Sequence, residues 1–252
     1  MNSDKEKFFV DGRMSVTITQ SDSLRHMLSL LHGMLKQNKL KDTFFWDAKY
    51  EGTLDLRPNV YDYDDVFLDF LFENNIPDKI NDIIGHDLSL YHIQIRRTNS
   101  ESSYMPWHRD SYFISGKQVG KIPPTYKLIY YPMFGKDKKC QLQLLKGSHH
   151  NWFPHQKSNE FLSPGFSHYD KQLFNVLGVE EIFSGNDEAI FFDSSMLHNV
   201  IGDDAEGSIR LMFSFIEYNQ FTTQDLNKPL HADLRKMYST RLAKMRRARS
   251  SN

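Results

Sequence analysis

Apolar residues recur at helical spacing in the first third of the chain and again near its end. In the segment 23–35 they form one face of a helix, with Ser21 or Ser23 available as its N-cap; the face consists of Leu24, Met27, Leu28, Leu31, Met34 and Leu35. The same spacing predicts helices over 63–74, 77–84 and 230–245. Residues 1–87 are therefore expected to be mostly helical.

From residue 88 to 218 the pattern changes to the alternation of β-strands. Tyr91, Ile93 and Ile95 lie on one side of a predicted strand, and the residues between them are polar. Further strands are predicted over 126–131, 141–145, 188–192 and 209–218. Helices followed by strands, without regular βαβ alternation, favour an antiparallel β core, either a sandwich or a barrel, with helices packed on one side.

The pattern predicts a single domain over 1–252. It would comprise a mostly helical part at 1–87, a β core at 88–218, and a C-terminal helix with a basic tail at 219–252. That tail carries Arg241, Lys244, Arg246, Arg247 and Arg249, which we expect to be a solvated helix end. The segment 151–170 reads as a long loop, and loops of that length are often lids.

Composition narrows the function. The chain has 31 basic and 32 acidic residues and a net charge of −1, so no overall field would attract nucleic acid or an anionic membrane. No segment approaches the ~20 apolar residues of a membrane-spanning helix. One cysteine excludes an intramolecular disulfide, and the first seven residues lack the apolar core of a signal peptide, so we expect a cytoplasmic protein. The oligomeric state is left open.

Candidate metal ligands stand out at two places. His108 and Asp110 are two residues apart, so on an extended chain both side chains project to the same face. His198 follows the apolar run 189–197, where a strand would emerge from the core. Two imidazoles and one carboxylate on one face, with the opposite positions open, suit non-haem iron(II) and O₂.

Arg210 is a candidate anchor for a carboxylate. Residues 198 and 210 are equidistant from position 204 in a turn-rich segment, so in a hairpin centred there His198 and Arg210 would face each other. A guanidinium is always charged and grips a carboxylate through two parallel hydrogen bonds. That would suit the distal carboxylate of a dicarboxylic cosubstrate, although a surface arginine on a strand is the alternative.

These residues belong to a longer ordered pattern. It comprises His108-Arg109-Asp110, Gly147-Ser148-His149, Gly185-Asn186-Asp187, His198 and Arg210. In order and spacing, residues 88–218 resemble the phytanoyl-CoA dioxygenase-like (PhyH) family of iron(II)/2-oxoglutarate oxygenases.

The resemblance implies a double-stranded β-helix, a cupin-like jelly-roll barrel, holding Fe(II) through His108, Asp110 and His198. It also implies 2-oxoglutarate as cosubstrate on Arg210, O₂ as oxidant, and succinate and CO₂ as products. Related halogenases replace the carboxylate ligand with a small residue, so Asp110 implies hydroxylation of an unactivated C–H bond. Relatives place a second cosubstrate contact near Gln94, although the polar alternation of this strand favours a solvated strand face for that residue.

Two other functions remain open. Three protein ligands and a bound water would also serve a zinc hydrolase, but no Glu or His is evidently placed as its general base and Arg210 would have no task. A catalytically idle barrel that binds a ligand would have no need for all four site residues. Four further histidines, at 149, 150, 155 and 168, fall in a turn and a loop, so we expect some of them to be lid residues and none to bind a second metal.

Overall fold

The structure is a computed structural model of the chain. It describes residues 3–36, 54–55, 64–97, 105–109, 113–114, 117–118, 125–132, 141–151, 161–163, 166–167, 172–182, 187–201, 209–217 and 229–251. Asp110, the turn at 202–208 and most of the expected lid at 151–170 lie outside these ranges.

The described residues include five α-helices, in the N-terminal third and at the C-terminal end: α1 (Ser3–Asp11), α2 (Asp22–Lys36), α3 (Asp64–Glu73), α4 (Ile76–Ile84) and α6 (Pro229–Ser250). The four predicted helices are confirmed, and α6 extends to Ser250. The chain turns sharply around α4. Asn75 precedes it at φ 52°, and Gly85 ends it at φ 93°, donating its N–H to the carbonyl of Asn81.

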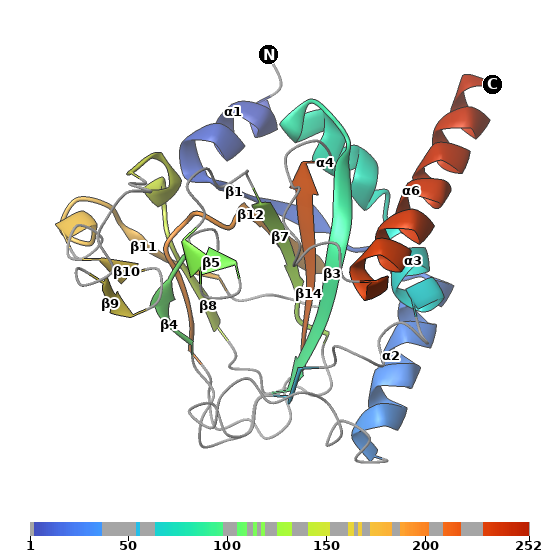
Figure 1. Ribbon diagram of the computed structural model, residues 1–252, viewed down its shortest axis with the longest axis horizontal. Coiled ribbons are helices and arrows are strands. Elements are labelled where there is room, and N and C mark those ends of the chain that lie inside the picture. The colour runs from blue at the N-terminus through green and yellow to red at the C-terminus, as the bar shows by residue number, and fades with distance from the viewer. Residues whose placement is uncertain are drawn as a thin grey trace.

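A six-stranded antiparallel sheet forms the larger layer (Figure 1). Its order is β1 (Arg13–Thr17), β12 (Glu188–Asp193), β7 (Thr125–Tyr130), β14 (Ile209–Glu217), β3 (Leu88–Arg97) and β2 (Leu54–Asp55). Strands β1 and β2 come from the part expected to be mostly helical. β1 escapes prediction because it is five residues long and only Val16 in it is buried, so it shows no alternation.

A four-stranded sheet forms the second layer, in the order β11 (Val179–Ile182), β8 (Gln141–Leu145), β13 (His198–Ile201) and β4 (Met105–His108). Two short pairs complete the described strands: β9 (Phe161–Ser163) with β10 (Phe166–Ser167), and β5 (Phe113–Ile114) with β6 (Lys117–Gln118). A 3-10 turn, η4 (Ser148–Asn151), follows β8.

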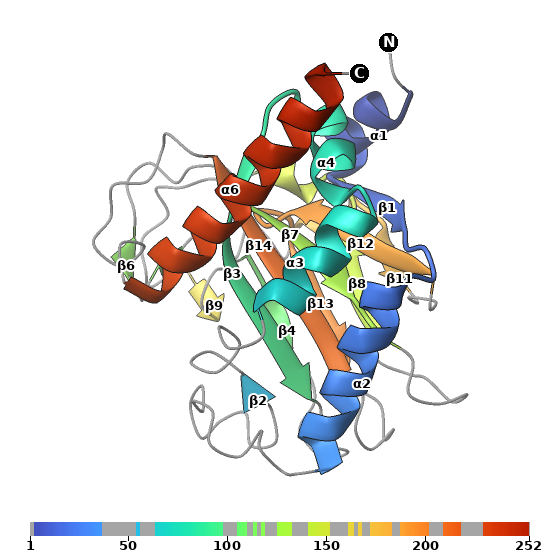
Figure 2. The ribbon, with the colours of Figure 1, turned by 90° about the vertical axis from the view of Figure 1, so that its right-hand side faces the viewer.

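Alternation along the long strands creates two separate cores. In β14, Leu211, Phe213 and Phe215 join a large cluster beneath the helices, whereas Met212 joins a smaller cluster between the two sheets. The smaller cluster also contains Leu142 of β8, so the sheets face each other. Figure 2 shows α2, α3, α4 and α6 lying across the outer face of the six-stranded sheet. The predicted antiparallel β core with helices on one side is confirmed.

The basic residues of α6 are not all solvated, contrary to expectation. Arg241 donates to Asp65 and Asp69 of α3, and Arg246 donates to Asp78 of α4 and Asp87 just beyond it. These contacts arise because α6 packs across the acidic ends of two earlier helices, which periodicity within one segment does not reveal. None of the described helices combines the length and apolarity needed to cross a membrane.

Candidate metal centre

His108 and His198 lie directly opposite each other. His108 ends β4, His198 begins β13, and the two strands pair antiparallel with these residues in register. The imidazole centroids are 4.1 Å apart. The residues are 9% and 3% exposed. Side chains that were predicted to share a metal from distant parts of the sequence are thus brought together.

The orientation of His198 is fixed from two sides. Its Nδ1 donates to the backbone carbonyl of Met196 at 2.9 Å, and the ring of Phe192 packs edge-on against it at 5.2 Å between centroids. The tautomer that donates from Nδ1 carries its lone pair on Nε2, which is then the nitrogen that could coordinate a metal. Ligating histidines typically use such a hydrogen bond to a carbonyl to set tautomer and ring angle.

The turn before His198 is stiffened by its own hydrogen bonds. The carboxylate of Asp193 accepts from the backbone N–H of Ser195 at 2.8 Å and from its hydroxyl at 2.6 Å. The N–H of Met196 donates to the carbonyl of Asp193 at 3.0 Å. The carbonyl that orients His198 therefore belongs to an ordered turn.

Asp110, the predicted third ligand, lies outside the described residues. Within the described ranges, no group of three or more His, Cys, Asp or Glu side chains is arranged to hold a metal. The described part of the predicted site is thus the histidine pair, and the carboxylate stays a prediction.

Arg210 and Gln94 lie on neighbouring strands of the other sheet. Gln94 of β3 is in register with Met212 of β14, two residues from Arg210. Alternation places Arg210 and Gln94 on the same inner face as Met212, toward the four-stranded sheet. Each is only 4% exposed, so Gln94 does not lie on a solvated strand face and Arg210 is not a surface arginine.

The predicted hairpin pairing of His198 with Arg210 is wrong. His198 lies in the four-stranded sheet opposite His108 and Leu144, whereas Arg210 lies in the six-stranded sheet opposite Arg96. Between residues 201 and 209 the chain passes from one sheet to the other. Equal spacing from a turn implies facing residues only when both strands stay in the same sheet.

His149 and His150 form a second pair of neighbouring imidazoles. They lie in η4, and their ring centroids are 3.9 Å apart. The Nε2 of His149 is 3.0 Å from the carbonyl of Phe9, which ties the turn to α1. Burial lowers the pKa of His149, which favours its neutral form. The expected lid role for the remaining histidines, at 155 and 168, falls outside the described residues.

Arg109 and Ser148 are buried polar residues whose structural role the sequence patterns did not indicate. Arg109 is 2% exposed, and its Nη1 donates to the carbonyls of Ser148, at 2.9 Å, and Ser195. Ser148 is fully buried and its hydroxyl accepts from the N–H of Leu197 at 2.8 Å. One signal was available: on an extended chain, position 109 points away from the face shared by 108 and 110.

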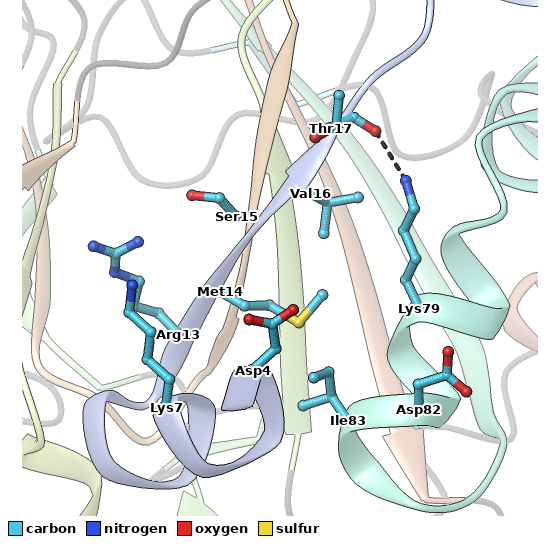
Figure 3. Close-up of a pocket in the computed structure, with 10 residues that line it drawn as sticks. All are labelled: Asp4, Lys7, Arg13, Met14, Ser15, Val16, Thr17, Lys79, Asp82 and Ile83. Atoms are coloured by element: carbon cyan, nitrogen blue, oxygen red, sulfur yellow. Dashed lines mark hydrogen bonds between the residues drawn. The ribbon is translucent and has the colours of Figure 1, made fainter. Parts of the chain in front are cut away.

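A pocket of about 350 Å³ lies elsewhere, between α1, β1 and α4 (Figure 3). In it, Lys79 donates to the carbonyl of Thr17 at 3.0 Å, and burial lowers the pKa of Lys79. The described residues of its lining include no histidine or cysteine; they are Asp4, Lys7, Arg13, Met14, Ser15, Val16, Thr17, Lys79, Asp82 and Ile83. It offers no metal-binding chemistry comparable with the histidine pair.

No family model matches the chain, and no curated protein matches it. Solved structures do match in fold. The apoform of EctD from S. alaskensis aligns with a TM-score of 0.69 at 11% identity, over 90% of this chain and 80% of that chain. The chain therefore has the fold of that protein. It is a double-stranded β-helix, a jelly roll with flanking helices.

Two further structures of this fold hold ligands. The epimerase SnoN in complex with Fe3+, alpha ketoglutarate and nogalamycin RO aligns with a TM-score of 0.65 at 10% identity, over 89% of this chain and 88% of that one. HygX from Streptomyces hygroscopicus, with nickel, 2-oxoglutarate and hygromycin B bound, aligns at 0.59 and 14% identity, over 90% and 94%. At these identities the likeness shows a shared fold.

Proposed function

We propose that this protein is an Fe(II)/2-oxoglutarate-dependent dioxygenase of the phytanoyl-CoA dioxygenase-like family. It would hydroxylate an unactivated C–H bond of a small molecule, with release of succinate and CO₂. The observation that carries the proposal is the buried, in-register pair of His108 and His198, with the Nδ1 of His198 donating to a backbone carbonyl.

The residues present fit a divalent metal. Neutral imidazole nitrogens suit iron, and the carbonyl of Met196 at 2.9 Å from Nδ1 fixes His198 in the tautomer that ligation requires. We assign Asp110 as the third ligand, since it is two residues from His108. Iron(II) bound there would allow O₂ to oxidise both 2-oxoglutarate, to succinate and CO₂, and a C–H bond of the substrate.

We assign Arg210 to the distal carboxylate of 2-oxoglutarate and Gln94 to a second contact. Both are buried on the inner face of the six-stranded sheet, on the side toward the sheet that carries His198. The Arg210 guanidinium is a planar cation that can bind a carboxylate through two parallel hydrogen bonds, so it could hold one end of a dicarboxylate ligand. The fixed fork of its N–H donors would orient that ligand.

Hydroxylation is the reaction we favour because Asp110 keeps a carboxylate in the ligand set. Proteins of the same fold include a carbocyclase, SnoK, and an epimerase, SnoN. Product analysis would separate these outcomes. A hydroxylated product gains one oxygen atom, a cyclised product loses two hydrogens, and an epimer keeps the mass of the substrate.

The first test is anaerobic titration of the apoprotein with Fe(II) and 2-oxoglutarate, monitored by the weak visible charge-transfer band of the chelate. We expect the band in the wild type and in His26→Ala, which removes an exposed histidine of α2. We expect its loss in His108→Ala and His198→Ala. A folded wild type that binds zinc tightly and never shows the band would reject the proposal.

Asp110→Ala tests the third ligand separately. Loss of the carboxylate should abolish substrate-dependent turnover of 2-oxoglutarate, measured as succinate formation. Full turnover in this variant would show that the metal assignment is wrong, even if the two histidine variants lose the charge-transfer band.

A further inference from the structure

Arg109 joins three segments that meet at the histidine pair. It directly follows His108, the last residue of β4. Its Nη1 donates to the carbonyl of Ser148, in the turn after β8, and to that of Ser195, in the turn before β13. One guanidinium nitrogen thus connects the strand end bearing His108 to the turn that leads into His198.

The same turns are joined by a second set of hydrogen bonds. The hydroxyl of Ser148 accepts from the N–H of Leu197 at 2.8 Å, and the N–H of Leu145 donates to the carbonyl of Leu197 at 2.9 Å. Leu197 directly precedes His198. Among the described residues, the end of β4, the end of β8 with the turn after it, and the turn that leads into His198 are therefore held within one buried network centred on Arg109 and Ser148.

The electrostatics of this position decide what Arg109 does. Its guanidinium is always charged, and at 2% exposure it carries a substantial desolvation cost. A positive charge beside a cation site also repels the cation. Removing the charge alone would therefore strengthen metal binding, whereas loss of the hydrogen bonds would weaken it.

We propose that Arg109 is a positioning residue that holds the turn bearing His198 against the strand end bearing His108, and so keeps the two imidazoles side by side. The inference rests on the proposed function, in that these imidazoles are taken as metal ligands. Loss of residues that orient ligands from outside the metal's own coordination sphere typically weakens metal affinity by about 10- to 100-fold. We expect Arg109→Met to fall in that range.

The experiment compares Arg109→Met, Arg109→Lys and Ser148→Ala with Arg241→Met, a control that removes a remote ion pair with α3. One measurement is the Kd for Fe(II) in the presence of 2-oxoglutarate. The second uses apoprotein: long-range proton–nitrogen correlation reports whether His198 still carries its proton on Nδ1, as its bond to Met196 requires. The control should change neither measurement at matched thermal stability.

The variants are ranked by what each removes. Arg109→Lys keeps one donor that reaches a carbonyl and should recover part of the affinity. Ser148→Ala removes only the hydroxyl acceptor of Leu197, keeps the carbonyl that Arg109 binds, and should fold even if Arg109→Met does not. We expect Ser148→Ala to weaken iron binding less than Arg109→Met does. It should also lower the fraction of His198 that carries its proton on Nδ1.

The outcomes separate the two proposals. Unchanged or tighter iron binding in both the Arg109→Met and Ser148→Ala variants, with the His198 tautomer retained, would overturn the role of Arg109 and leave the oxygenase proposal standing. If the wild type never forms the iron chelate while the tautomer still shifts in Arg109→Met, the oxygenase proposal fails. The positioning role of Arg109 on His198 would then stand without it.

Discussion

The two faces of the six-stranded sheet differ sharply in what they bury. On the face covered by helices the side chains are apolar and largely aromatic. Phe70 of α3 stacks on Tyr130 at 5.4 Å and on Phe213 at 5.8 Å between ring centroids. Phe191 and Phe215 extend this cluster, and all these residues are at most 1% exposed. This face has the size and composition to supply most of the hydrophobic stabilisation.

The inner face, toward the four-stranded sheet, mixes apolar and polar side chains. On β14, Met212 is apolar, but Arg210 and Ser214 share its face and are 4% and 2% exposed. Buried polar groups stabilise little and constrain geometry strongly. Consecutive residues of one strand thus belong to regions with different roles, so substitutions at neighbouring positions should change different properties.

The largest expected effect is on the apolar face. Phe213→Ala should lower the free energy of unfolding by about 3–5 kcal/mol, because it leaves a cavity in a fully buried aromatic cluster. Urea denaturation measures it, and Phe213→Leu, which keeps most of the volume, should lose much less. If the Ala variant lost iron affinity at temperatures where it remains folded, the two faces would not be separable in this way.

Gly12 probes the contact between the helices and the turn before His198. Its φ is +82°, and an added Cβ would lie 2.4 Å from the Sδ of Met196 and 2.6 Å from the Nδ1 of His149. Left-handed backbone alone costs about 1–2 kcal/mol, and overpacking adds about 1–3 kcal/mol. Thermal unfolding of Gly12→Ala should show that the free energy of unfolding falls by the sum of these two costs.

Gly33→Ala is the matched control for Gly12→Ala. Gly33 lies within α2, and an added Cβ would have no neighbour within 4 Å among the residues that the structure describes. Alanine is the better helix former, so this variant should gain about 0.5–1 kcal/mol. If both variants lost the same free energy of unfolding, the close approach at Gly12 would not be the cause of the loss.

On the inner face, Arg210→Met should change ligand binding more than folding. Loss of a charge-assisted hydrogen bond should weaken 2-oxoglutarate binding by about 1.5–3 kcal/mol, roughly ten- to a hundredfold in Kd. Methionine keeps much of the volume of the arginine side chain, so this variant should not create a large cavity in the inner face. Calorimetric titration together with thermal unfolding checks both statements, and an unchanged Kd would remove Arg210 from the site.

The fold was predictable from sequence where one segment carries its own pattern. The alternation from 209 to 218 and the helical face from 23 to 35 predicted β14 and α2 within a residue of their observed bounds. Pairing between segments was not predictable in the same way. Strand β1 joins the sheet by pairing with β12, which is distant in sequence. The hairpin assumed for His198 and Arg210 failed because the chain changes sheet between them.

The residues of the candidate site also differ in whether the sequence alone could identify them. His108 and His198 were identified by residue type and position, and the structure brings them together. The structural role of Arg109 was not identified, because a charged residue is expected to be exposed unless its partners are known. Its partners are backbone carbonyls in two turns that are remote in sequence. Every residue has a backbone carbonyl, so the sequence does not indicate which carbonyls accept from Arg109. Only the folded structure shows this role.

The smallest expected effect concerns the ion pairs that join α6 to the other helices. Arg246 donates to Asp78 and Asp87, and its side chain is 34% exposed. Each partly exposed pair contributes about 0.2–1 kcal/mol and is screened by salt. Arg246→Met should therefore unfold at a slightly lower urea concentration than the wild type, and the difference should shrink as salt is raised.

Lys244→Met is the control for Arg246→Met, since Lys244 is an exposed residue of the same helix. The prediction also tests how far the two regions are coupled. Arg246 lies in α6 outside the six-stranded sheet, and the pair His108 and His198 lies in the four-stranded sheet on its other side. Iron affinity should therefore be the same in both variants, and a change confined to Arg246→Met would show that α6 affects the geometry of the inner face through the sheet between them.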